Sequence, residues 1–162
     1  MSPKLSPTVE RAIDRLAREA TVSTLLHATA RELVDLLEAP RCSISRAVGD
    51  LLVEVTEFRT SGTTPTLDLY LASDYPLTQE VLERGEPRLV SLGTADVDPA
   101  EAELLRRLGF SELLMLPLSS RGHRWGLVEI YTNERPFARA DVETGQALLG
   151  GTEAALGALE HG

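Results

Sequence analysis

Cysteine is nearly absent from this chain of 162 residues, which contains only Cys42. A single cysteine excludes a disulfide bond within the chain and argues against a zinc site built from cysteines. Histidine is also scarce, at three residues. His27 falls in a predicted helix, His123 at a predicted turn and His161 in the C-terminal tail, where histidines are usually solvated. The sequence therefore predicts no metal site and no haem ligand, and the identity of any cofactor stays unknown.

Long hydrophobic runs and an excess of positive charge are missing as well. No apolar run approaches the roughly 18 residues that a membrane-spanning helix needs, and the N-terminal stretch has no apolar signal core. The chain carries 25 acidic and 16 basic residues, a net charge of −9, whereas nucleic-acid-binding surfaces are basic. We therefore expect a cytoplasmic protein with no nucleic-acid partner and no membrane partner.

Apolar residues at helical spacing predict helices at both ends of the chain. Ser6 and Pro7 mark the start of the first helix, and the last helix is predicted from about residue 138 to 159. The apolar stripe of the first helix is Val9, Ile13, Leu16 and Ala20, and that of the second, within 23–39, is Leu26, Ala30, Leu33 and Leu37.

Six runs of branched and apolar residues predict strands between these helices. Runs 41–48 and 51–60 flank Gly49-Asp50, and runs 111–120 and 123–132 flank Arg121-Gly122, so each pair reads as a hairpin. Shorter runs cover 67–73 and 87–92, and short helices are predicted over 75–85 and 99–109. Tight turns between strands favour an antiparallel sheet, and the predicted class is α+β with about six strands.

The last predicted helix contains four glycines, Gly145, Gly150, Gly151 and Gly157. Each glycine inside a helix costs about 1 kcal/mol relative to alanine. Two interpretations remain open: a weak terminal helix, or close packing in which small residues let another helix approach.

Three stretches in the second half of the chain resemble the GAF domain family. SDYPLTQEVLERGEPRLVSL (73–92) is similar to the family's short helix that ends at Gly before a strand. ELLRRLGFSELLMLPLSSRGHRWGLVEIYT (103–132) resembles its strand hairpin, and RPFARADVETGQALL (135–149) resembles the start of its final helix. The nearest look-alikes are the GAF domains that precede diguanylate cyclase domains.

The resemblance implies a fold and a division of the chain. The expected fold is GAF-like, and so profilin-like: a six-stranded antiparallel sheet with the terminal helices on one face and short helices and loops on the other. The family binds small molecules on the second face. Residues 21–162 would form the GAF domain, and residues 1–20 an N-terminal helix for dimerisation or signalling. Because terminal helices in this family often pair, we expect a homodimer.

The residues argue against the best-known chemistries of the family. TNERPFARAD keeps Asn133, Phe137 and Asp141 but lacks the lysine and the Asp-Glu pair typical of cyclic-nucleotide-binding members. Methionine sulfoxide reduction requires a second cysteine to resolve the first. Bilin-binding members attach the chromophore through a cysteine after the middle strands, whereas Cys42 lies in the first predicted strand.

The strand GLVEIY, residues 126–131, points to a candidate ligand site. Alternation places Val128 and Ile130 on the helix face and Leu127, Glu129 and Tyr131 on the other. The same reasoning puts Cys42, Ile44 and Val48 on the helix face. The predicted ligand-binding residues are Ser43, Ser45, Tyr70, Tyr75, Met115, Trp125, Glu129 and Tyr131. An alternative interpretation leaves Glu129 partly exposed or pairs it with Arg46, Arg59 or Arg124.

Together these features predict a sensory or regulatory module that is not an enzyme. It would bind an unidentified small molecule and relay binding through its terminal helices. The alternative is a ligand-free module for dimerisation or protein interaction, with Val9, Ile13, Leu16 and Ala20 as its seam.

Overall fold

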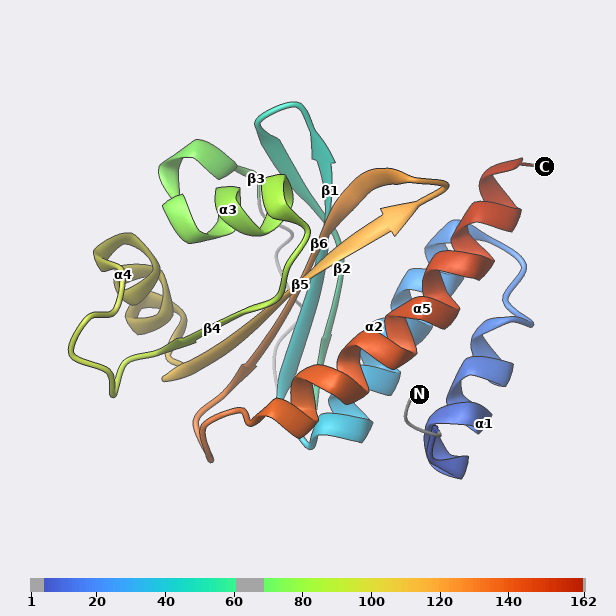
Figure 1. Ribbon diagram of the computed structural model, residues 1–162, viewed down its shortest axis with the longest axis horizontal. Helices are drawn as coiled ribbons and strands as arrows, with labels where there is room; N and C mark the ends of the chain where they lie inside the picture. Colours follow the sequence, from blue (N-terminus) through green and yellow to red (C-terminus); the bar gives the residue numbers. More distant parts are fainter. Residues whose placement is uncertain (1–4, 61–68, 162) are drawn as a thin grey trace.

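The computed structural model describes residues 5–60 and 69–161, and residues 61–68 lie outside this description (Figure 1). Its elements, in chain order, are α1 (Pro7–Leu16), α2 (Val22–Leu37), β1 (Arg41–Val48), β2 (Leu51–Arg59), β3 (Leu69–Leu71), the 3-10 turn η1 (Ala72–Asp74), α3 (Pro76–Arg84), β4 (Arg88–Ser91), α4 (Pro99–Leu108), β5 (Glu112–Ser120), β6 (His123–Thr132) and α5 (Arg139–His161).

The six strands form one sheet in the order β3-β2-β1-β6-β5-β4, and all neighbours pair antiparallel. Helices α1, α2 and α5 lie on one side of the sheet, and α3 and α4 on the other (Figure 1). This arrangement confirms the predicted α+β class, the six-stranded antiparallel sheet and the positions of the terminal and short helices. We call the two sides the helix face and the pocket face. Among the described residues, no helix combines the length and the hydrophobicity needed to cross a bilayer.

The helix face is packed with apolar side chains. Leu114, Leu116 and Leu118 of β5 and Val128 and Ile130 of β6 join α2 and α5 in one buried cluster. Alternation predicted this face for Val128 and Ile130. Cys42 and Ile44 of β1 belong to the same cluster. Val48 does not, because the hairpin projects beyond the helices and leaves this side chain 57% exposed.

Helix α1 packs within the chain rather than offering its apolar stripe to a partner. The Ser6 hydroxyl accepts from the Val9 N–H, as its predicted cap requires. The helix ends at Leu16, earlier than the stripe suggested. Val9 and Leu16 are buried in the molecule. The predicted dimer seam is therefore wrong at these two residues.

The glycines of α5 permit close packing at two positions. A Cβ atom at Gly151 would lie 2.8 Å from Cγ2 of Ile13 in α1, and one at Gly145 would lie 2.8 Å from Cδ1 of Leu116 in the sheet. At Gly150 a Cβ atom would meet nothing within 4 Å. Close packing thus accounts for Gly145 and Gly151 but not for Gly150.

Candidate functional site

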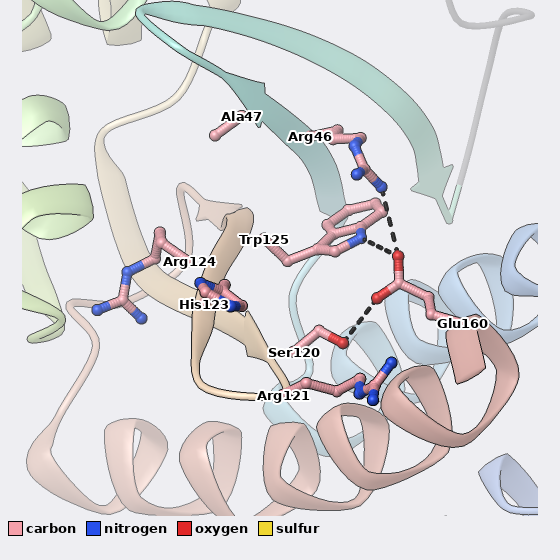
Figure 2. A pocket seen from close by; sticks show the side chains of 8 residues that line it. All are labelled: Arg46, Ala47, Ser120, Arg121, His123, Arg124, Trp125 and Glu160. Atoms are coloured by element: carbon pink, nitrogen blue, oxygen red, sulfur yellow. Dashed lines mark hydrogen bonds and ion pairs between the residues drawn. The ribbon is translucent and has the colours of Figure 1, made fainter.

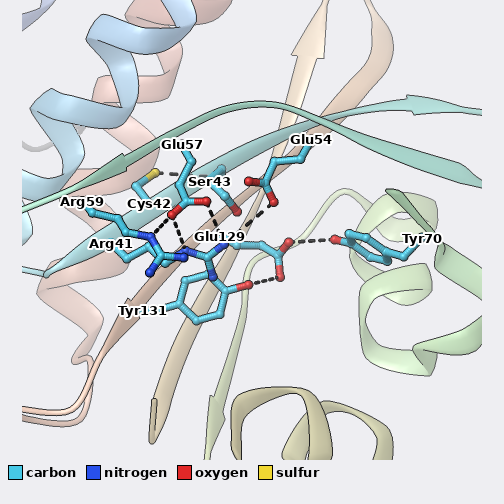
Figure 3. Close-up of polar contacts among 9 residues, drawn as sticks. All are labelled: Arg41, Cys42, Ser43, Glu54, Glu57, Arg59, Tyr70, Glu129 and Tyr131. Carbon is cyan, nitrogen blue, oxygen red and sulfur yellow. Dashed lines mark hydrogen bonds and ion pairs between the residues drawn. The ribbon is translucent and has the colours of Figure 1, made fainter. Parts of the chain in front are cut away.

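Glu129 is the buried centre of the pocket face. It lies in β6 and is 3% exposed. The Tyr70 hydroxyl donates to its Oε1 at 2.7 Å, and the Tyr131 hydroxyl donates to its Oε2 at 2.9 Å (Figure 3). Burial raises the pKa of Glu129, although both tyrosine hydrogen bonds act to lower it. The carboxylate is thus held by two phenols from β3 and β6.

Arg41 supplies a buried positive charge beside this carboxylate. It begins β1, directly opposite Tyr131 in β6, and its guanidinium lies 4.6 Å from the centre of the Tyr131 ring. Its Nη2 donates to Oε2 of Glu57 at 3.2 Å, and its Nε lies 3.1 Å from Oε1 of the same carboxylate. Burial lowers the pKa of Arg41, but the hydrogen bond to Glu57, together with the electrostatic attraction of Tyr131, Glu57 and Glu54, outweighs burial and raises it. Arg41 is therefore charged.

A β-bulge brings a second carboxylate to the same side. The register of β1 and β2 shifts between Ile44 and Ser45, so that Ser43 pairs with Glu57 and Ser45 pairs with Glu54. Glu54 and Glu57 are three positions apart, which in a regular strand would place them on opposite faces of the sheet. The extra residue of the bulge places both on the pocket face. Burial and the neighbouring Glu57 raise the pKa of Glu54 to about 8. Glu54 is therefore mostly protonated at neutral pH.

Glu57 is the ionised member of this carboxylate pair. Burial opposes its ionisation, but hydrogen bonds from Arg41 and Arg59 lower its pKa. The two guanidinium groups thus share one carboxylate (Figure 3).

These side chains border a cavity of about 390 Å³ between the sheet and helix α4. This size lies within the usual range of ligand pockets, roughly 300–1,000 Å³. We call it the Glu129 pocket. Its lining residues come from five strands and helices and from the turn before α3: Arg41, Glu54, Leu69, Tyr70, Tyr75, Leu104, Arg107, Leu108, Glu129 and Tyr131.

Tyrosine and arginine side chains form the outer part of the pocket. The rings of Tyr70 and Tyr75 meet edge to face with centroids 5.5 Å apart. Nη2 of the exposed Arg107 in α4 donates to the Tyr75 hydroxyl at 3.4 Å. The short helices and the turn between them thus cover the sheet, as the family resemblance implied.

Four of the predicted ligand-binding residues line the pocket together: Tyr70, Tyr75, Glu129 and Tyr131. Ser43, Ser45 and Met115 lie on the same face but do not line the cavity. Ser43 and Met115 flank Glu129 on the neighbouring strands. Met115 is fully buried, and its sulfur accepts from the Thr78 hydroxyl at 3.5 Å. These three residues support the floor of the site.

Trp125 lies on the helix face, so its predicted place in the site is wrong. A bulge between Leu118 and Ser119 of β5 shifts the register, and this extra residue of β6 turns toward α5. Its Nε1 donates to Glu160 at 3.1 Å, and Arg46 stacks 4.7 Å from its ring centre (Figure 2). It lines a separate surface hollow of about 550 Å³.

The predicted ion pair of Glu129 with Arg46, Arg59 or Arg124 is also wrong. The partners of Glu129 are the two tyrosines, and the nearby cation is Arg41. The sequence prediction missed Arg41, Glu54 and Arg107 as lining residues. Alternation along β1 could have found Arg41, because it shares a face with Ser43.

Cys42 is separated from the pocket by the sheet itself. It is a free cysteine, fully buried in the apolar cluster of the helix face, which is the face that alternation predicted. Burial raises the pKa of its thiol, which disfavours the reactive thiolate. Neither its position nor its ionisation suits covalent attachment of a ligand in the Glu129 pocket.

The family model for the GAF domain matches residues 21–155. The chain belongs to the GAF domain family. This finding confirms the family that the sequence motifs indicated, and the match begins just before α2. A search of curated proteins finds no match.

Solved structures of similar fold include GAF domains from phytochromes. A phycoerythrobilin-bound GAF domain from a cyanobacterial phytochrome is 21% identical, with a TM-score of 0.82 and full coverage of both chains, 100% each. A phycocyanobilin-bound GAF domain, also from a cyanobacterial phytochrome, is 20% identical with a TM-score of 0.81, over 99% of this chain and 98% of that one. A bacteriophytochrome of R. palustris is 16% identical with a TM-score of 0.84. The GAF domain here is 99% covered in that match but spans only 40% of the bacteriophytochrome chain.

Proposed function

We propose that this GAF domain is a non-enzymatic sensory or regulatory module that binds a small molecule in the Glu129 pocket. One observation carries the proposal: two buried polar side chains that line the pocket have atoms without a hydrogen-bond partner in the described residues. Nη1 of Arg41 and Oε1 of Glu54 have no hydrogen-bond partner among residues 5–60 and 69–161. Buried polar atoms without partners each cost about 1–3 kcal/mol, and more when charged, so a ligand that pairs with them would be stabilised.

The similar structures support a small molecule as the ligand. Two of them are GAF domains with bound bilins. Cys42 faces away from the pocket of this chain, so we propose a ligand that is held without a covalent bond. The net charge of −9 supports the absence of nucleic-acid and anionic-membrane partners, and the location that we propose is the cytoplasm.

Polar contacts support a relay from the pocket side to α5. Arg124 of β6 donates through Nε to the Leu82 carbonyl at the end of α3, at 3.1 Å. Its Nη1 donates to the Ser119 hydroxyl at 2.5 Å, and the Ser119 N–H donates to Glu153 of α5 at 2.6 Å. A ligand that moves α3 would act on α5 through the β5–β6 hairpin.

Native mass spectrometry of protein purified gently from its host tests the proposal. We expect a discrete extra mass on each subunit of the wild type. The Leu104→Trp variant, which fills the pocket from α4, should lose this mass, whereas the exposed control Arg106→Trp on the same helix should keep it. Two outcomes would contradict binding in this pocket: Leu104→Trp retains the extra mass, or the wild type carries no extra mass even after incubation with host metabolites.

A ligand-free dimerisation module is the second candidate function. Exposed small residues recur at a spacing of four along α5: Gly150, Ala154 and Ala158. Such spacing lets two helices approach closely. If α5 pairs in a homodimer, Ala154→Glu should convert it to a monomer in sedimentation experiments. The control Arg106→Glu, at an exposed position of α4 on the other side of the sheet, should leave the dimer intact, and a wild type that sediments as a monomer would rule out this function.

A further inference from the structure

The hydrogen-bonding groups that remain free in the Glu129 pocket restrict the chemistry of its ligand. Arg41 is 3% exposed, and its Nη1 carries two N–H groups without a partner in the described parts of the chain. The charge-assisted bonds that such a group makes are strongest with carboxylate and phosphate oxygens. The first free group of the pocket is therefore a charged donor.

Glu54 supplies the second free group. Its Oε1 has no partner within residues 5–60 and 69–161, and its Oε2 lies 3.8 Å from Nη2 of Arg41, which is longer than a hydrogen bond. Burial and a hydrogen bond to Glu57 raise its pKa to about 8, so the carboxyl is mostly protonated at neutral pH and a ligand must compete with Glu57 for its O–H group. Arg41 and Glu54, from neighbouring strands, thus border the same cavity with one charged donor and one protonated carboxyl.

Two other carboxylates beside the cavity, Glu57 and Glu129, already accept hydrogen bonds from side chains. Glu57 accepts from Arg41 and Arg59, and Glu129 accepts from Tyr70 and Tyr131. These groups and Arg107 at the rim are the charged and titratable groups that surround Glu54 on the neighbouring strands and on α4. The free hydrogen-bonding capacity of the pocket is therefore mainly that of donors.

Size, apolar walls and charge set further limits. The volume of about 390 Å³ lies near the lower end of the usual range for ligand pockets, roughly 300–1,000 Å³, and so favours a compact ligand. Leu69, Leu104 and Leu108 line it with the tyrosine rings. The nearby carboxylates Glu57 and Glu129 oppose a second negative charge, which disfavours a phosphate dianion.

From these features we infer that the Glu129 pocket binds a compact monocarboxylate with an aromatic or branched apolar body. Its carboxylate accepts hydrogen bonds from Arg41 Nη1 and from the protonated carboxyl of Glu54, and its apolar body lies among Leu69, Leu104 and Leu108. This inference rests on the proposed function, because it names the ligand class of the same site. No bond is made or broken in the protein.

Calorimetric titration with three probes of similar shape tests the ligand class. Phenylacetate, phenylacetamide and phenethylamine present an anion, a neutral amide and a cation on the same aromatic body. We expect phenylacetate to bind at least about tenfold more tightly than the amide, since an amide cannot accept two charge-assisted bonds, and we expect no binding of the amine.

The proton on Glu54 gives a second signature. Phenylacetate affinity should fall by up to about tenfold for each pH unit above the Glu54 pKa of about 8, as that donor is lost. Glu54→Gln keeps an N–H donor and cannot ionise, so its affinity should be nearly constant between about pH 7 and pH 9. Arg41→Lys should weaken binding at least about tenfold. Should the Arg41 variant fail to fold, the pH profile of Glu54→Gln still decides.

The unfavourable outcomes separate this inference from the proposed function. Equal or tighter binding of the amide or the amine, abolished by Leu104→Trp, would overturn the carboxylate class while leaving a ligand pocket in place. Absence of phenylacetate binding, or an unchanged pH profile in Glu54→Gln, would also overturn the class. The proposed function itself fails when host metabolites leave no extra mass on the wild type, or when Leu104→Trp retains that mass.

Discussion

The two faces of the sheet differ in how completely their buried groups are satisfied. On the helix face, leucine, valine and isoleucine side chains pack against α2 and α5, and a buried polar pair between these helices, Thr29 and Thr152, is hydrogen-bonded at 3.0 Å. On the pocket face, Arg41, Glu54 and Glu101 keep buried atoms without partners in the described residues. The first face stabilises the fold, whereas the second keeps hydrogen-bonding capacity that a ligand can use.

The largest expected effect contrasts a core leucine with a pocket leucine. Leu116→Ala should destabilise the protein by about 2–5 kcal/mol, because Leu116 is fully buried on the helix face and its removal leaves a cavity. Leu104→Ala should cost clearly less, since Leu104 of α4 is only partly buried. Urea unfolding of both variants measures the difference. Equal losses would mean that the pocket face contributes as much packing as the core.

A buried carboxylate on the pocket face should make stability depend on pH. Glu101 of α4 accepts from the Thr78 hydroxyl of α3 at 2.6 Å, and its second oxygen has no partner within the described residues. Burial raises its pKa to about 7, against the Thr78 bond that lowers it. The folded state therefore binds more protons than the unfolded state between the ordinary carboxyl pKa and about 7, so stability falls as pH rises through this window.

Replacing Glu101 with glutamine should remove this penalty. Glu101→Gln should be more stable than wild type by about 1–3 kcal/mol near pH 8 and nearly equal to it near pH 4. The exposed control Glu103→Gln on the same helix should show no such pH-dependent gain. Thermal unfolding across this pH range measures the difference, and a loss of stability at high pH would show that ionised Glu101 stabilises α4.

A matched pair of glycines sharpens the description of the helix face. Gly151→Ala should destabilise by about 1 kcal/mol, because the added methyl group overlaps Ile13 of α1 and overpacking outweighs the helix propensity of alanine. Gly150→Ala should stabilise by up to about 1 kcal/mol, because its Cβ meets open space. Chemical denaturation tests both signs. A stabilised Gly151→Ala would mean that α1 is not held against α5 at this point.

The smallest effect concerns the link between the two faces. Arg124→Gln removes bonds to Leu82 and Ser119 and should lower stability by about 1 kcal/mol or less, since Arg124 lies near the surface. Phenylacetate should then protect the α5 amides from hydrogen exchange less than it does in wild type. Unchanged protection in this variant would exclude Arg124 from the relay.

Local sequence signals determined most of the fold. Gly49-Asp50 and Arg121-Gly122 fixed two hairpins, and the strands β1 and β6 begin and end at the residues that their patterns predicted. Ser6 and Pro7 likewise start α1 as predicted. These features depend on turn geometry, caps and alternation, which act over a few residues and are therefore legible in the sequence.

Only the tertiary structure decided the composition of the site. The bulge in β2 places Glu54 and Glu57 on one face, and the bulge in β6 removes Trp125 from it. Glu129 was predicted to face the pocket, but its partners Tyr70 and Tyr131 and its neighbour Arg41 become evident only when β3, β6 and β1 are paired. A bulge depends on the register between two strands, and burial of a charge depends on what covers the sheet. Neither the register nor the burial can be read from the residues adjacent in the sequence.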